Sequence, residues 1–146
     1  MSESLQLQTQ IAQKANRVGG AVDRWLMNPA SANHARYGRW AETYRGIMTN
    51  PNATARQINF AKGIRGRFVD RRMSTWMEST FRSRYPTMQL DRTLPGSTLR
   101  PDAFFPNIGG RSVIFDFGGP SKVGDIMKYS GMADDLIPIV PTPFVP

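Results

Sequence analysis

Cysteine is absent from this 146-residue chain, and histidine occurs only once, as His34. These absences exclude disulfides, thiolate metal sites, a cysteine nucleophile and a zinc site built from several histidines of one chain. No apolar run approaches the roughly 18 residues that a bilayer-spanning helix needs. The N-terminus has no apolar segment of the kind that marks a secretory signal peptide. We therefore expect a protein of an aqueous compartment that needs a separate carrier to cross a membrane.

Acidic residues are also scarce. The chain has 11 Asp and Glu against 19 Lys and Arg, which gives a net charge of +8. This balance favours an anionic partner, namely nucleic acid, an acidic protein or a membrane surface. Most of the cations are arginines, whose planar guanidinium groups suit bidentate contacts with phosphate. The alternative is a basic but otherwise ordinary soluble protein.

The N-terminal half of the sequence is predicted to be helical. Apolar residues recur there at spacings of three and four, and Asn-Pro pairs beginning at Asn28 and Asn50 interrupt the pattern. Thr54 is a good N-cap for a third, longer helix. The expected helices cover residues 2–28, 32–48 and 54–82.

After Pro86 the pattern becomes strand-like. We expect a short helix before the last strand and no strand in the Pro-rich end. The expected strands are 85–94, 98–105, 112–117 and 137–140, the helix is 125–136, and the Pro-rich end is 141–146. The predicted fold class is α/β (α+β), with a helical N-terminal extension and then the order helix, three strands, helix, strand around a small mixed sheet. The extension covers 1–52 and the core 53–146, in one compact unit.

Two aspartates stand in or beside strand-like runs of the second half. Asp102 and Asp116 flank a hairpin turn expected at residues 107–110, which would bring them together. Two carboxylates held close repel each other, and a hard divalent cation relieves that repulsion. Mg²⁺ prefers oxygen ligands and typically takes one or two carboxylates, with waters and substrate phosphates completing its shell. The alternative is that Asp102 caps a turn and Asp116 is a surface strand residue.

The run from Arg100 to Asp102, "RPD", is followed by the hairpin and by an apolar strand that ends in Asp116. This arrangement resembles the PD-(D/E)XK nuclease superfamily, and in particular the C-terminal nuclease domains of bacterial polymorphic toxins. The order of elements over roughly 54–140 is similar to its α-β-β-β-α-β, restriction-endonuclease-like core. The resemblance implies that Asp102 and Asp116 bind Mg²⁺ or Mn²⁺. It also implies that an acid on the preceding helix can join them, for which Glu78 is the candidate.

One position departs from the superfamily's pattern. The motif ends in acid-x-Lys, whereas this chain has glycine at the lysine position, Gly118. A glycine cannot stabilise charge or orient the attacking water. Lys122, just past the turn, or Lys128, on the helix that the resemblance places after the hairpin, could replace the missing lysine. Otherwise the domain has lost catalysis and kept binding, or the resemblance is false.

The expected function is that of a metal-dependent nuclease acting as a toxin or effector domain in bacterial competition. Its expected substrate is DNA, although the sequence does not separate DNA from RNA. The residues expected to contact the phosphate backbone are Arg65, Arg71, Arg72 and Arg100. The resemblance implies an acidic immunity protein that covers the basic face, and secretion followed by delivery into a target-cell cytoplasm. The alternative is a catalytically degenerate module that binds nucleic acid or a protein partner.

Overall fold

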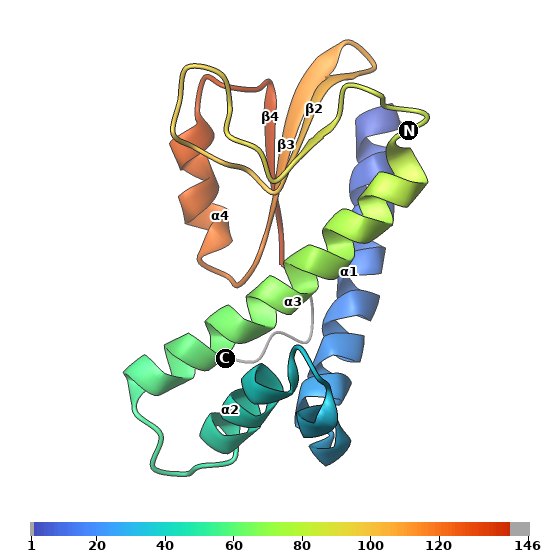
Figure 1. Cartoon of the computed structure of the whole chain (residues 1–146). Helices are drawn as coiled ribbons and strands as arrows, with labels where there is room; N and C mark the ends of the chain where they lie inside the picture. The colour runs from blue at the N-terminus through green and yellow to red at the C-terminus, as the bar shows by residue number, and fades with distance from the viewer. Residues whose placement is uncertain (1, 141–146) are drawn as a thin grey trace.

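The computed structural model describes residues 2–140, so the Pro-rich end discussed above lies outside the described residues. The helix α3 runs diagonally across the molecule, between the sheet with α4 on one side and α2 on the other (Figure 1). No helix of the described residues is long and apolar enough to cross a membrane. The helical elements of the N-terminal half are α1 (Glu3–Met27), the 3₁₀ helix η1 (Pro29–Asn33), α2 (Gly38–Met48) and α3 (Ala55–Phe81).

The two long helices begin and end close to where their caps predict. Ser2 caps α1 by accepting a hydrogen bond from the Leu5 N–H at 3.2 Å. Thr54 and Gln57 form a capping box at the start of α3, each side chain accepting the other's backbone N–H. The helix predicted over 32–48 was too long, because η1 and α2 share that range. The two elements approach so closely at Gly38 that a Cβ there would lie 2.2 Å from the Ala32 carbonyl oxygen.

An ion pair joins α1 to α3 in the interior. Arg65 is 1% exposed, and its Nε and Nη2 donate to the two carboxylate oxygens of Asp23 at 2.5 and 3.1 Å. Tyr44 of α2 lies close to both charges, and burial together with Asp23 raises the pKa of its hydroxyl. The prediction that Arg65 contacts phosphate was therefore wrong, because its guanidinium group is enclosed and already holds a carboxylate. A count of charges along a helix does not reveal which of them face inward.

The second half folds into a four-stranded mixed sheet in the order β1-β2-β3-β4. The first two pairings are antiparallel and the third is parallel. The chain reaches β4 through the short helix α4 and the 3₁₀ helix η2. The elements are β1 (Gln89–Leu90), β2 (Ala103–Ile108), β3 (Arg111–Phe117), α4 (Lys122–Asp125), η2 (Ile126–Tyr129) and β4 (Asp135–Ile139). The predicted fold class and the order helix, three strands, helix, strand are confirmed.

The largest differences in extent in this half concern three predicted elements. The strand expected over 98–105 begins at Ala103 and continues to Ile108, because the Leu99 carbonyl accepts the Leu94 N–H in a turn before it. The first strand has two residues instead of ten, because Asp91 takes a positive φ of 51° and ends it. The helix expected over 125–136 ends at Tyr129, since Gly131 turns with φ 82° and Asp135 already begins β4.

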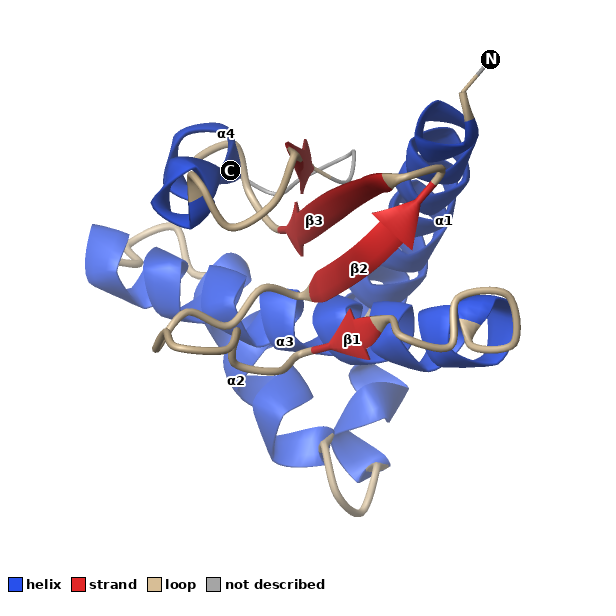
Figure 2. Cartoon of the chain, turned by 90° about the horizontal axis from the view of Figure 1, so that it is seen from above, coloured by secondary structure: helices blue, strands red, loops and turns tan. Residues whose placement is uncertain are grey.

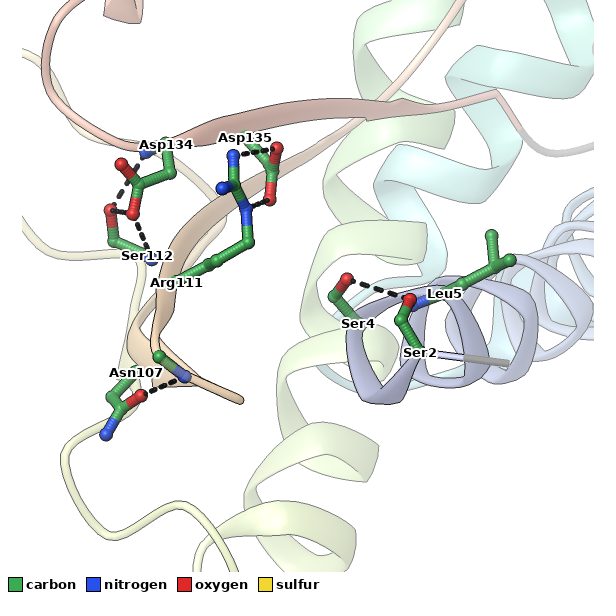
Figure 3. Close-up of polar contacts among 9 residues, drawn as sticks. Ser2, Ser4, Leu5, Asn107, Arg111, Ser112, Asp134 and Asp135 are labelled. Carbon is green, nitrogen blue, oxygen red and sulfur yellow. Dashed lines mark hydrogen bonds and ion pairs between the residues drawn. The ribbon is translucent and has the colours of Figure 1, made fainter.

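The β2–β3 hairpin has the tight turn that the sequence predicts. Ile108 pairs with Arg111, which leaves Gly109 and Gly110 as a two-residue loop with φ 57° and 87°. Positive φ at both loop residues is what a type I′ turn requires. At the same end of the sheet, Arg111 donates to both oxygens of Asp135 at 2.9 and 3.0 Å, which ties β3 to β4 (Figure 3).

The sheet has an apolar cluster on each face, and the view from above shows α1, α3 and α4 grouped around its strands (Figure 2). Phe105 and Phe115 point to the layer of α1 and α3, whereas Ile114 packs with Tyr129 of η2 on the other side. The larger core cluster also contains Leu7 and Ile11 of α1. The helical N-terminal residues and the α/β part therefore share one hydrophobic core.

The ion pair gives a stability prediction. Replacing Arg65 by Ala strands the Asp23 carboxylate in a mostly buried position, and breaking a buried pair costs about 3–5 kcal/mol. We expect Arg65→Ala to lower the free energy of unfolding by roughly 3 kcal/mol, measured by urea denaturation. The control is Arg67→Ala, an exposed residue of the same helix, which should change stability by no more than about 0.5 kcal/mol. Equal losses in the two variants would contradict a specific role for the pair.

Candidate functional site

The two aspartates lie opposite each other on the β2–β3 hairpin. The register pairs Ala103 with Phe115, and continuing it by one pair places Asp102 opposite Asp116. The Asp102 N–H donates to Asp116 Oδ1 at 2.9 Å, and the Phe117 N–H donates to Asp102 Oδ2 at 2.6 Å. Each carboxylate therefore accepts a backbone N–H from the opposite chain segment, just beyond the last backbone pair of β2 and β3.

These two hydrogen bonds explain why one aspartate can stand in β3 and another directly before β2. A backbone N–H that lacks a carbonyl partner needs another acceptor, and here each carboxylate supplies one. The same hydrogen bonds also force the two carboxyl groups together. Asp116 is 2% exposed and Asp102 is half-buried. Burial first, and then the charges of Asp70 and Asp116, raise the pKa of Asp102 to about 8.

A third carboxyl group reaches the pair from α3. Burial, together with the charges of Asp116 and Asp91, raises the pKa of Asp70 to about 7, although the Lys122 charge acts in the opposite direction. We call Asp70, Asp102 and Asp116 the acidic cluster. Asp70 was not among the predicted site residues, although the sequence holds a signal for it. Gly63, Gly66 and Asp70 recur at helical spacing and lie on one face of α3.

The ammonium group of Lys122 lies beside this cluster. Its Nζ is 3.4 Å from Asp116 Oδ2, and the Tyr129 hydroxyl donates to the same oxygen, also at 3.4 Å. A Cβ at position 118 would lie 2.7 Å from Lys122 Cε and 2.8 Å from its Cγ. The lysine stem therefore occupies the space that a side chain at Gly118 would fill. Glycine at position 118 makes room for a lysine that comes from four residues further along the chain.

The acidic cluster opens onto two adjoining grooves beside α3. One groove, of about 470 Å³, has Asp70, Asp102, Arg67 and Arg71 among its lining residues. The other, of about 530 Å³, is lined by Asp70, Arg67, Lys62, Lys122 and the Gly118–Gly119 turn. We call them the strand groove and the turn groove. Because both include Asp70 and Arg67, Asp70 lies where the two grooves meet, between walls that carry basic side chains. Asp102 lines the strand groove, whereas the buried Asp116 lines neither groove.

Other predicted site residues lie elsewhere. Glu78 is exposed on α3 and pairs with Arg82 at 2.7 Å, so the helix acid of the cluster is Asp70 and the expectation for Glu78 was wrong. Lys128 is exposed with its Nζ 5.1 Å from the Tyr129 ring centroid, and no ion pair joins it to the acidic cluster within residues 2–140. Arg100 is exposed, pairs with Asp91 at 2.9 Å and lines neither groove. Arg71 and Arg72 are exposed, as their predicted role requires.

The donor set suits a hard divalent cation in its chemistry. All three groups are carboxyls, and burial and mutual repulsion raise the pKa of two of them, which a bound cation would counteract. Among residues 2–140, no group of three or more His, Cys, Asp or Glu side chains is arranged to hold a metal ion. A site would therefore rest on the Asp102–Asp116 pair with waters and substrate oxygens, the kind of shell that Mg²⁺ prefers.

The raised pKa values predict how stability responds to pH. An aspartate in the unfolded chain has a pKa near 3.9, whereas the pKa of Asp102 in the folded protein is about 8. The folded protein therefore binds the Asp102 proton more tightly, and the stabilisation that this proton provides is lost as the pH rises from about 4 to about 8. Asp102→Asn should match the wild type near pH 4 and be more stable at pH 8.5. The expected gain exceeds about 1.4 kcal/mol, the equivalent of one pKa unit. Urea denaturation in EDTA at both pH values measures the difference, and Asp125→Asn, at an exposed position, is the control. A gain that does not grow with pH would contradict the account.

No family model matches the chain, and neither a curated protein nor a solved structure is significantly similar to it. The function of the acidic cluster therefore has to be argued from its own geometry.

Proposed function

We propose that the chain is a metal-dependent nuclease whose active site is the acidic cluster with Lys122. The observation that carries the proposal is the Asp102–Asp116 pair with an ammonium group 3.4 Å from Asp116. Asp102 lines the strand groove and Lys122 lines the turn groove, and both grooves have basic side chains in their walls. The α-β-β-β-α-β order of elements supports the resemblance to the PD-(D/E)XK superfamily.

In this proposal Asp102 and Asp116 hold Mg²⁺ or Mn²⁺, and Asp70 adds negative charge from the facing helix. The ion would act as a Lewis acid and activate water for phosphodiester hydrolysis. Arg67, which lines both grooves, would position a substrate phosphate over the carboxyl groups. Lys122 would stabilise the negative charge that develops on that phosphate. These roles require no side chain at position 118.

The biological role remains a prediction from the resemblance. A toxin of this kind would be secreted and delivered into a target-cell cytoplasm, and an acidic immunity protein would neutralise it. DNA is the first substrate to test, with RNA as the second.

The proposal predicts cleavage of supercoiled plasmid or total RNA with Mg²⁺ or Mn²⁺ and none with EDTA. Asp102→Asn and Asp116→Asn should each lower the cleavage rate at least about a hundredfold, and Lys122→Ala roughly 10²- to 10³-fold, as when one donor to developing charge is lost. Glu78→Gln is the matched control, because this exposed acid lies on α3 away from the cluster, and it should cleave at the wild-type rate. Binding without cleavage by the wild type, with every divalent metal tested, would favour the degenerate binding module instead.

The packing of Lys122 over Gly118 gives a separate prediction. Gly118→Ala should displace the flexible lysine stem from Asp116 and lower the cleavage rate towards that of Lys122→Ala. Because Gly118 has a φ of 159°, the added side chain also strains the backbone, so cleavage is compared well below the melting temperature of the variant. Gly124→Ala is the control, since a Cβ there has no neighbour within 4 Å. Undiminished cleavage by Gly118→Ala would show that Lys122 does not act from its position against the glycine.

A further inference from the structure

A further groove lies between α1 and α3, outside the acidic cluster. This α1–α3 groove has a volume of about 630 Å³. Five of its lining residues are cationic: Lys14, Arg17, Arg24, Arg71 and Arg72. The three from α1 follow helical spacing on one face of that helix, and the two arginines of α3 face them.

The cations of this groove are not neutralised by the protein. No described Asp or Glu side chain lines the groove. Within residues 2–140, no ion pair joins any of the five cations to a carboxylate. Arg65 differs sharply, since it is buried against Asp23 on the inner side of the same helix. The groove therefore concentrates unpaired positive charge on a surface that an anion can reach.

The extent of the charge points to a polymer. Lys14 and Arg24 are ten residues apart on α1, which corresponds to about 15 Å along a helix. A single phosphate or carboxylate cannot contact cations spread over that length, whereas successive phosphates of a nucleic-acid strand can. Trp76 also lines the groove, with Lys14 Nζ 5.7 Å from its ring centroid. Aromatic side chains beside a basic track are typical of grooves that bind single strands.

The α1–α3 groove also adjoins the strand groove. Arg71 and Thr75 line both, and Asp70 and Asp102 lie in the strand groove. A strand bound between α1 and α3 could therefore continue past Arg71 to the acidic cluster.

We infer that the α1–α3 groove is a binding site for the phosphate backbone of nucleic acid outside the active site. The nature of the polyanion rests on the proposed function, whereas the location of the site rests on the groove itself. The helix α1 is then one wall of the substrate-binding surface. The site would bind without sequence preference, because phosphate contacts carry no base information.

The test compares two double variants that remove the same charge. Arg17→Ala with Arg72→Ala removes two groove cations. Arg39→Ala with Arg92→Ala removes two exposed arginines that line none of the three grooves. Binding of fluorescein-labelled single-stranded and duplex oligonucleotides is followed by anisotropy in EDTA, so that cleavage cannot occur.

The groove variant should bind roughly tenfold more weakly. Its plot of log affinity against log salt should be shallower by about 1.4 for the single strand, at 0.7 for each lost contact. The control variant should bind within twofold of the wild type. Equal losses in both variants, or no loss in the groove variant, would overturn the inference. So would competition by poly-glutamate as effective as that by unlabelled oligonucleotide, since the groove would then suit an acidic protein.

Cleavage assays separate this inference from the proposed function. Cleavage by the wild type, with unchanged binding by the groove variant, refutes the groove site alone. Groove-dependent binding without cleavage in any divalent metal refutes the nuclease and leaves the binding site standing.

Discussion

The register of the β2–β3 hairpin determines where the two aspartates lie. The two-residue turn pairs Ile108 with Arg111, and an irregularity between Phe105 and Ile108 then shifts the register by one residue. Asp102 and Asp116 therefore lie opposite each other, and each accepts the other strand's N–H. The two hydrogen bonds between these carboxylates and the backbone hold the Asp102 and Asp116 carboxyl groups close together, where Asp116 is buried and Asp102 is half-buried. Two features accompany that repulsion: the Lys122 ammonium group lies beside Asp116, and burial with the neighbouring charges raises the pKa of Asp102.

The helix α3 lies between this hairpin and the N-terminal helices, and each of its faces contacts a different part of the molecule. Arg65 faces α1 and holds Asp23 in the interior, Asp70 faces the hairpin, and Arg71 and Arg72 face the α1–α3 groove. A single rigid helix therefore fixes the distance between the core, the acidic cluster and the basic surface. The arginines of this helix look equivalent in a count of charges but differ entirely in what they can bind.

Local signals in the sequence predicted the local features of the structure. Capping residues and Asn-Pro breaks predicted the ends of the long helices, and the Gly-Gly pair predicted the hairpin turn. These signals are reliable because a cap, a break or a tight turn depends only on neighbouring residues. Inward and outward faces were harder, since Arg65 and Asp70 acquire their surroundings only when distant elements pack against α3. The sequence left Lys122 and Lys128 as candidates for the missing lysine. Lys122 is the one that lies beside Asp116, and this depends on the path of the chain after Gly118. The short β1 illustrates the same limit, because alternation alone does not reveal the turn at Asp91.

The shared core bears on where the chain can be divided. A fragment beginning at residue 53 would keep every residue of the acidic cluster, yet it would lose Asp23, Leu7 and Ile11. It would expose the apolar surface on which α1 rests and remove the Asp23 carboxylate that Arg65 contacts in the interior. Tyr85, whose hydroxyl donates to Glu3 at 2.6 Å, would also lose its acceptor. For expression or for fusion to another domain, the smallest unit that can be expected to stay soluble therefore includes α1.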